Sequence, residues 1–351
     1  MWYIISIMVV DINNFKIEFE KIINKYDEYA IIPHYNPDPD ALGSSFGLHY
    51  LLNKVFNKKS QIFYGGIIGR AENNMMVQAL DIPIINLKED DALPNLPIIL
   101  MDTQPNTGNN PLIPNVLPAI IFDHHPVQKT SLEVEYADIR LEYGASCTII
   151  YNYFKEYGIK PTINVATGLY YGIQTDVVGE GRTAFKIDFV SMEELSKNIS
   201  REKLFSIEKP NLPLDYYLHI RKGLENAVIY NDFLISSLGD VINPDYIGEI
   251  ADFLIRCDKV NVVLIMGIYK NVIQLSFRSQ RKKLDAGDTI KKIVGSFGTA
   301  GGHTSNAGGR IVVRDEQDIP KISKKIITKS LEIILGKITS GIPFLSFSDY
   351  F

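Results

Sequence analysis

Short apolar runs alternate with amphipathic stretches through the first half of the chain. Three runs are almost wholly apolar and predict buried strands: residues 30–32, 97–101 and 119–122. Apolar positions at helical spacing predict three helices, over residues 41–54, 146–157 and 164–174. Strands that alternate with helices are typical of an α/β domain whose mostly parallel sheet is flanked by helices.

The texture of the sequence changes between residues 191 and 213, where charged helical sequence gives way to a proline-containing stretch. We therefore place a linker at residues 196–222. It separates a first domain, residues 1–195, from a second domain, residues 223–343, and residues 344–351 form an aromatic tail. We expect the two domains to face each other across a cleft.

The second domain is predicted to be a smaller α/β domain. Three apolar runs predict its strands: residues 227–237, 260–269 and 271–277. A hairpin turn is expected at Lys270-Asn271. A predicted helix over residues 286–294 leads into a glycine-rich segment, residues 298–309, whose backbone N–H groups would be able to approach an anion closely.

Composition and charge narrow the class of protein. With 46% hydrophobic and 22% charged residues, the chain has the composition of an ordinary globular protein. The net charge of −5 argues against a broad basic surface for long nucleic acid, although bound cations can attract a small polyanion locally. The two cysteines, Cys147 and Cys257, form no CxxC pair and indicate free thiols.

The first ten residues are apolar, but they are too short to span a bilayer and have no basic leader. We therefore expect a cytoplasmic protein with no membrane partner. Met1 and Met8 are alternative starts of the chain.

Four segments combine carboxylates with imidazoles at the ends of predicted elements. In chain order they contribute His34, Asp38 and Asp40; Asp102; Asp123, His124 and His125; and Asp176. Three of the segments follow predicted strands, and the first also precedes a helix, whose N-terminus favours phosphate. Because ligands bind beyond the carboxyl ends of the strands in an open α/β sheet, we expect these side chains to converge.

So many carboxylates in one place would repel each other unless cations were bound between them. Mixed aspartate and histidine ligands without a thiolate suit Mn²⁺, with Mg²⁺, Co²⁺ and Zn²⁺ as alternatives. The set is large enough for two divalent ions, about 3.5–4 Å apart if they share a carboxylate. A single aspartate at a strand end is more often a turn residue, and we expect His49 and His219 to be structural. The combination of motifs carries the metal-site prediction.

These motifs resemble those of the DHH phosphoesterase family, which is named for the triplet that is Asp123-His124-His125 here. The resemblance covers nearly the whole chain. Residues 301–309 are similar to the signature of the DHH-associated substrate domain of oligoribonucleases, cyclic-dinucleotide phosphodiesterases and RecJ-type exonucleases. Residues 276–279 resemble a strand of that domain that carries a phosphate-binding arginine.

The resemblance implies a role for each motif residue. His34 and Asp38 would hold one metal, Asp40, His124 and Asp176 the other, and Asp102 would bridge the two. Asp123 would orient a ligand and His125 would face the substrate, which makes these two the implied catalytic residues. The implied substrate-binding residues are Arg278, Gly301, Gly302, His303, Gly308 and Gly309. Many bacterial members have Thr, Phe and Arg soon after the residue equivalent to Asp176; residues 177–182 differ, so a role for Arg182 stays open.

The predicted function is metal-dependent phosphodiester or phosphomonoester hydrolysis by a hydroxide held between two metals. The expected substrates are short oligoribonucleotides, linear dinucleotides or 3′-phosphorylated nucleotides such as pAp. The alternatives are a single-strand-specific exonuclease, a cyclic-dinucleotide phosphodiesterase and, from a different class, a non-catalytic nucleotide-binding regulator. A homodimer is one of the oligomeric states that the sequence leaves open.

Overall fold

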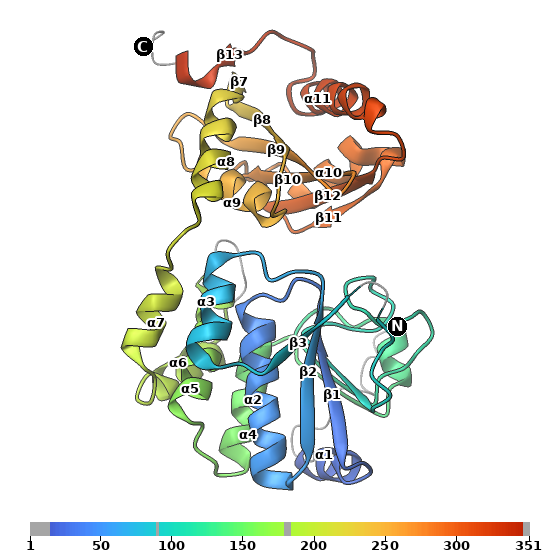
Figure 1. Ribbon diagram of the computed structural model, residues 1–351, viewed down its shortest axis with the longest axis vertical. Coiled ribbons are helices and arrows are strands. Elements are labelled where there is room, and N and C mark those ends of the chain that lie inside the picture. Colours follow the sequence, from blue (N-terminus) through green and yellow to red (C-terminus); the bar gives the residue numbers. More distant parts are fainter. Residues whose placement is uncertain (1–14, 89–90, 179–183, 347–351) are drawn as a thin grey trace. The chain divides into compact units, whose positions relative to one another are not determined.

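The computed structural model describes residues 15–88, 91–178 and 184–346. The chain divides into two compact units, Met1–Pro210 and Asn211–Phe351 (Figure 1). Met1, Met8, Arg182 and the last five residues of the aromatic tail lie outside the described residues. No described helix is both long enough and apolar enough to cross a bilayer.

Six parallel strands form the sheet of the first unit, in the order β3-β2-β1-β4-β5-β6. The strands are β1 (Glu28–Pro33), β2 (Lys59–Gly65), β3 (Ile84–Leu87), β4 (Ile98–Met101), β5 (Ile120–Asp123) and β6 (Tyr136–Ile139). The helices are α1 (Phe15–Ile23), α2 (Pro39–Phe56), α3 (Ala71–Leu80), α4 (Ser146–Glu156), α5 (Ile163–Val177), α6 (Lys186–Leu195) and α7 (Arg201–Glu208), with the 3-10 turn η1 (Lys129–Glu133). The predicted parallel α/β sheet is confirmed.

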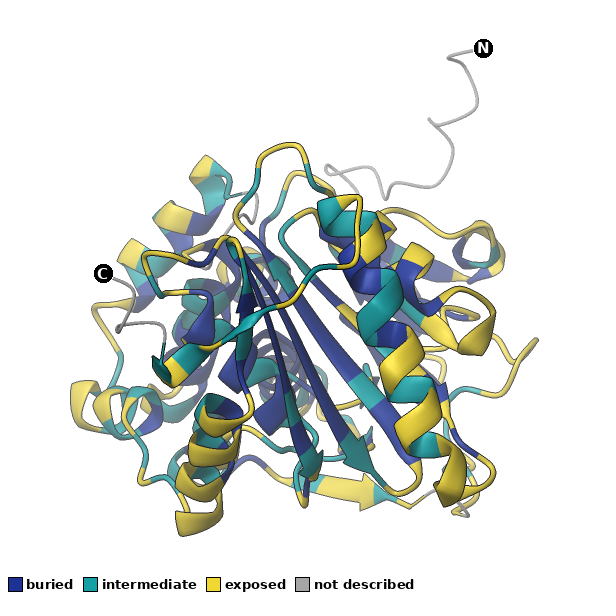
Figure 2. Ribbon diagram, turned by 90° about the horizontal axis from the view of Figure 1, so that it is seen from above, coloured by how far each residue is buried: buried dark blue, intermediate teal, exposed yellow. Residues whose placement is uncertain are grey.

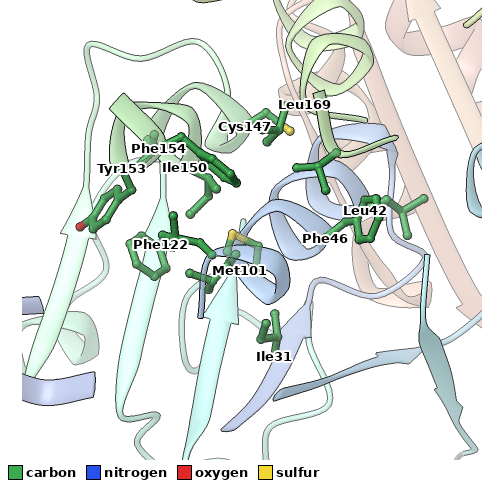
Figure 3. Close-up of a cluster of buried hydrophobic side chains, with 14 of the residues drawn as sticks. Ile31, Leu42, Phe46, Met101, Phe122, Cys147, Ile150, Tyr153, Phe154 and Leu169 are labelled. Carbon is green, nitrogen blue, oxygen red and sulfur yellow. The ribbon is translucent and has the colours of Figure 1, made fainter. Parts of the chain in front are cut away.

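The core of this unit lies between the central strands and the helices α2, α4 and α5 (Figure 3). Ile31, Met101 and Phe122 point from three neighbouring strands towards these helices, and all three are fully buried. The alternate strand residues, including Ile32 and Leu100, are buried on the opposite face of the sheet. Burial of both faces explains why the central strands are continuous apolar runs instead of alternating patterns.

Two glycines let α2 and α5 approach closely. A Cβ atom at Gly43 would lie 2.6 Å from the carbonyl oxygen of Gly168 on α5. A Cβ atom at Gly172 would lie 2.9 Å from the carbonyl oxygen of Pro39 and 3.1 Å from Cα of Asp40. Because only glycine fits at such contacts, the C-terminal end of α5 lies against the N-terminal end of α2.

A seven-stranded mixed sheet forms the second unit, in the order β11-β12-β10-β9-β8-β7-β13. Among the described strand pairs of this sheet, β8–β9 is parallel and the others are antiparallel. The strands are β7 (Val228–Tyr230), β8 (Phe233–Asp240), β9 (Val262–Tyr269), β10 (Val272–Ser279), β11 (Thr299–Gly302), β12 (Asn306–Val312) and β13 (Ile342–Pro343). The helices are α8 (Leu214–Glu225), α9 (Asp245–Leu254), α10 (Ala286–Val294) and α11 (Ile319–Leu335), with the 3-10 turns η2 (Gly295–Phe297) and η3 (Glu316–Asp318). Separate apolar clusters cover the two faces of the sheet, so its central strands β8, β9 and β10 are largely buried, whereas every residue of the edge strand β11 is exposed or half-buried (Figure 2).

The structure refines the sequence-based assignment of the second half of the chain. The run 227–237, predicted as one strand, forms β7 and β8, because Asn231 adopts a left-handed conformation (φ 59°) and turns the chain. The glycine-rich segment, for which no element was predicted, forms a hairpin of β11 and β12. The segment predicted as a linker contains α7 and most of α8, and the predicted domain boundaries stay a prediction. The hairpin predicted at Lys270-Asn271 is present.

Candidate metal centre

The parallel sheet brings three of the predicted site segments to one edge. Pro33 of β1 pairs with Met101 of β4, and Met101 pairs with Phe122 of β5. The residues that follow these positions are His34, Asp102 and Asp123. Because parallel strands end at the same edge of a sheet, the three segments leave the sheet side by side.

The N-terminus of α2 supplies two more carboxylates. Asp38 is the N-cap, and its Oδ1 accepts hydrogen bonds from the main-chain N–H groups of Asp40 and Ala41, both at 3.1 Å. The helix begins at Pro39, two residues earlier than predicted, because proline is favoured in the first helical turn. Asp40 therefore lies on the helix and is fully buried.

The described side chains form three groups in which a metal ion would find at least three ligand atoms: His34, Asp38 and Asp102; Asp40, His124 and Asp176; and Asp102, His124 and His125. In the first group, Nε2 of His34 lies 3.4 Å from Oδ2 of Asp102 and 3.6 Å from Oδ1 of Asp38. Asp102 belongs to two groups, so it lies between His34 and His124.

The two carboxylates of the second group, together with that of Asp102, surround Nε2 of His124. This atom lies 3.3 Å from Asp102 Oδ1, 3.6 Å from Asp176 Oδ2 and 3.9 Å from Asp40 Oδ2. It is buried, yet among the described residues it has no hydrogen-bond partner. A buried nitrogen without a hydrogen-bond partner, facing three carboxylates, fits a divalent cation bound between them.

The electrostatics of the cluster favour bound positive charge. Burial lowers the pKa of His124, but the carboxylates of Asp102, Asp40 and Asp176 outweigh burial and raise the pKa to about 10. Burial, reinforced by the charge of Asp102, raises the pKa of Asp40 to about 7. The site therefore holds positive charge strongly, whether a proton or a metal cation carries it.

Asp102 has a backbone conformation that is uncommon for residues other than glycine. Its φ is +57°, in the left-handed region, and its N–H group donates to the carbonyl oxygen of Phe122 at 2.8 Å. A non-glycine residue in this region costs about 1 kcal/mol or more, although aspartate and asparagine tolerate it best. Such strain at a strand end is characteristic of functional positions, and here it places the carboxylate between two histidines.

Asp123 does not belong to any of the three groups and instead supports His125. Its Oδ1 accepts hydrogen bonds from the main-chain N–H of His124 at 2.8 Å and from Nδ1 of His125 at 2.9 Å. Its Oδ2 accepts from Nε2 of Gln104 at 2.5 Å. Gln104 is nearly fully buried and was missed by the sequence analysis, although its position two residues after Asp102 was a usable signal.

The sequence analysis also missed that the N-terminus of α4 contacts the carboxylates of the site. The main-chain N–H groups of Ser146 and Cys147 donate to the two carboxylate oxygens of Asp40, at 2.7 and 2.8 Å. The hydroxyl of Ser146 donates to Oδ1 of Asp102 at 2.9 Å. The first N–H groups of a helix have no partner within the helix, so the predicted start of a helix at residue 146 was the available signal.

With this geometry in place, the comparison with known proteins decides the family. Residues 28–173 match the N-terminal domain of the DHH family, and residues 230–329 match the DHHA1 domain. The chain belongs to the DHH family of phosphoesterases. Its resemblance to that family, inferred from the motifs, is confirmed.

Three similar proteins illustrate the relationship. An uncharacterized protein of Methanocaldococcus jannaschii is 32% identical over 312 residues, 87% of this chain, and the chain spans only 63% of that protein's length. The bifunctional oligoribonuclease and PAP phosphatase NrnA of Mycoplasma genitalium is 24% identical over 332 residues, 87% of this chain and 96% of NrnA. The crystal structure of an exopolyphosphatase-related protein from Bacteroides fragilis has the same fold (TM-score 0.64, 16% identity, 93% of this chain and 99% of that one).

The DHHA1 domain holds the predicted substrate-binding arginine in a network of its own. The guanidinium of Arg278, on β10, forms an ion pair with Asp252 of α9. It also donates to the hydroxyl of Ser276 at 2.8 Å and to the carbonyl oxygen of Phe277 at 3.1 Å. The side chain is therefore held in one orientation and is mostly covered, with 12% of its surface exposed.

The glycines of the DHHA1 hairpin differ in their surroundings. Gly301 pairs with Gly308 across β11 and β12, and a Cβ atom at Gly301 would meet nothing within 4 Å. In contrast, a Cβ at Gly302 would lie 2.4 Å from Cα of Ala307, and one at Gly309 would lie 2.8 Å from Val294. Gly302 and Gly309 are thus required by packing, whereas Gly301 leaves an open stretch of backbone. His303 lies in the turn, where its main-chain N–H donates to the carbonyl oxygen of Asn306.

Proposed function

We propose that this protein is a metal-dependent phosphodiesterase or phosphatase that hydrolyses short oligoribonucleotides, linear dinucleotides or 3′-phosphorylated nucleotides such as pAp. The observation that carries the proposal is a pair of adjacent ligand groups at the carboxyl edge of the parallel sheet: His34, Asp38 and Asp102, and Asp40, His124 and Asp176. The two groups are adjacent because Nε2 of His124 lies 3.3 Å from Oδ1 of Asp102. Each of these groups combines one imidazole with two carboxylates, a donor set for hard divalent cations.

In this proposal His34, Asp38 and Asp102 hold one ion and Asp40, His124 and Asp176 hold the second, with Asp102 between them. Mn²⁺ suits the mixed nitrogen and oxygen ligands best, and Mg²⁺, Co²⁺ and Zn²⁺ are the competitors. When bound, the two ions supply an activated water and neutralise charge on the phosphoryl oxygens.

His125 is proposed to act on the substrate directly. Its side chain is 45% exposed, unlike those of His34 and His124, which are 13% and 12% exposed. Its Nδ1 is hydrogen-bonded to Asp123, so Nε2 is the nitrogen that is available to the substrate, and it can donate a proton to the leaving oxygen when the ring is in its protonated form. Asp123 fixes the tautomer and the orientation of the ring.

Two observations support a short nucleotide as the substrate. NrnA, the relative from Mycoplasma genitalium, is named as an oligoribonuclease and PAP phosphatase, and its alignment spans nearly its whole length. The net charge of −5 argues against a long basic track for extended strands. Arg278, His303, the open backbone at Gly301 and the backbone of Gly308, which pairs with it, are the proposed contacts for the nucleotide phosphates.

The test is hydrolysis by metal-stripped protein that has been resupplied with Mn²⁺. The substrates are pAp, pApA, cyclic di-AMP and RNAs of increasing length from the dinucleotide upward. His124→Ala is the inactivating variant. His49→Ala is its matched control, because His49 bonds Ser60 and belongs to none of the three ligand groups.

Metal-dependent cleavage that decreases with chain length and is lost only in His124→Ala would support the proposal. Processive digestion of long RNA would instead indicate a single-strand exonuclease, and preference for cyclic di-AMP a cyclic-dinucleotide phosphodiesterase. Tight nucleotide binding without turnover of any of these substrates would overturn the proposal in favour of a non-catalytic regulator.

A further inference from the structure

Ser146 makes hydrogen bonds to two carboxylates that belong to different ligand groups. Its main-chain N–H donates to Oδ2 of Asp40 at 2.7 Å, and its hydroxyl donates to Oδ1 of Asp102 at 2.9 Å. Ser146, Asp40 and Asp102 are all buried, with at most 4% of their surface exposed. Ser146 therefore orients the carboxylates of Asp40 and Asp102, two negative charges that repel each other.

These hydrogen bonds leave the carboxylates able to bind a metal. An ionised carboxylate offers about four acceptor positions on its two oxygens. Asp40 uses one position on each oxygen, for Ser146 and for Cys147. Its remaining positions are free of these two donors, and its Oδ2 faces Nε2 of His124 at 3.9 Å.

A third carboxylate, Asp188 of α6, holds the start of α4 from the other side. It is fully buried, and both of its oxygens accept from the main-chain N–H of Gly144, at 3.0 and 2.9 Å. Its Oδ1 also accepts from the hydroxyl of Thr148 at 2.6 Å, and its Oδ2 from the N–H of Phe185 at 2.8 Å. Asp188 thus binds residues on both sides of Ser146 in the chain.

We propose that Ser146 and Asp188 are positioning residues of the metal centre: Asp188 anchors the N-terminus of α4, and Ser146 in turn holds the carboxylates of Asp40 and Asp102 where each of them completes a ligand group. This inference rests on the proposed function, because it assumes that the two carboxylates bind metal. Neither residue contacts the reacting atoms. Residues that orient metal ligands typically change metal affinity or activity about 10–100-fold when they are removed.

The experiment measures Mn²⁺ binding to the metal-stripped protein by calorimetry, together with the melting temperature. Ser146→Ala removes the hydroxyl bond to Asp102 and keeps the main-chain bond to Asp40. Asp188→Asn removes the charge that anchors α4. Ser191→Ala is the matched control, because Ser191 lies on α6 and is buried, and its hydroxyl has no hydrogen-bond partner in the described parts of the chain.

Mn²⁺ affinity should decrease about 10–100-fold in Ser146→Ala and in Asp188→Asn, and it should be unchanged in Ser191→Ala. The double variant should lose less than the product of the two single effects, because both residues act through the same helix terminus. Wild-type affinity in a folded Ser146→Ala would overturn this inference while leaving the proposed function intact. Failure of the wild-type protein itself to bind Mn²⁺ would overturn the proposed function and this inference with it.

Discussion

Nδ1 of His125 lies 2.9 Å from Oδ1 of Asp123, two residues earlier in the chain. The same oxygen accepts the main-chain N–H of His124, so one carboxylate orients two consecutive histidines. Oδ2 of Asp123 is occupied by Gln104. The middle and last residues of the triplet therefore have different surroundings: His124 faces three carboxylates inside the cluster, whereas His125 is half-exposed and tied to Asp123.

The first prediction separates these two histidines. His125→Ala should lower kcat about 100-fold or more, because a proton donor to the leaving group is lost, and should leave Mn²⁺ affinity nearly unchanged. His124→Ala should abolish tight Mn²⁺ binding. Steady-state kinetics and calorimetry on the same preparations measure the two effects, and equal loss of Mn²⁺ affinity in both variants would identify His125 as a metal ligand instead.

The second prediction concerns the support of His125. Asp123→Asn keeps the size of the side chain but removes the charge that fixes the ring tautomer, so kcat should decrease about 10–100-fold with a smaller change in KM. Gln104→Leu should act in the same direction and less strongly, because Asp123 would keep its hydrogen bonds from the main-chain N–H groups of His124 and His125 and from Nδ1 of His125. An unchanged kcat in Asp123→Asn would show that the hydrogen bond to His125 has no role in catalysis.

The third prediction concerns metal and stability. Chelation of metal should lower the melting temperature, and Mn²⁺ should restore it, because cations bound only by the folded state stabilise it by about 2.7 kcal/mol at a concentration 100 times Kd. Asp176→Asn should remove most of this Mn²⁺-dependent shift. Asp138→Asn is the contrasting variant: Asp138 pairs with Arg140 and belongs to none of the three ligand groups, so stability should decrease while the Mn²⁺-dependent shift persists.

The fourth prediction uses the backbone of Asp102. Both Asp102→Asn and Asp102→Ala should abolish metal-dependent activity. In metal-free buffer, however, the alanine variant should be less stable than the asparagine variant by about 1 kcal/mol, since asparagine tolerates a positive φ and alanine does not. Urea unfolding of the two variants measures this difference, and equal stability would argue against backbone strain at this position.

The fifth prediction separates structural from binding glycines in the DHHA1 domain. Gly309→Ala should destabilise the domain, because the added methyl group would meet Val294. Gly301→Ala should leave the melting temperature nearly unchanged and raise KM, since its Cβ would cover open backbone. A Gly301→Ala variant with unchanged KM would remove this backbone from the proposed substrate contacts.

The apolar runs, together with the polar residues that follow them, were sufficient to predict the parallel α/β sheet and the residues that lie at its edge. A run such as residues 119–122 is apolar throughout only because both faces of the strand are buried. Short polar turns were harder to interpret. The Asn231-Asp232 pair interrupts an apolar run, but it contains neither glycine nor proline to mark a turn. The helix α7 forms within the segment that was predicted to be a linker.

The sequence by itself determined which side chains are available for metal chemistry, because their types and their places after predicted strands are local properties. Only the tertiary structure decided how those side chains are held. Asp40 is oriented by α4, Asp123 by Gln104, and the start of α4 by Asp188. The physical reason is that these hydrogen bonds join residues far apart in the chain: each partner looks like an ordinary cap or turn residue until packing, here aided by Gly43 and Gly172, brings the two together.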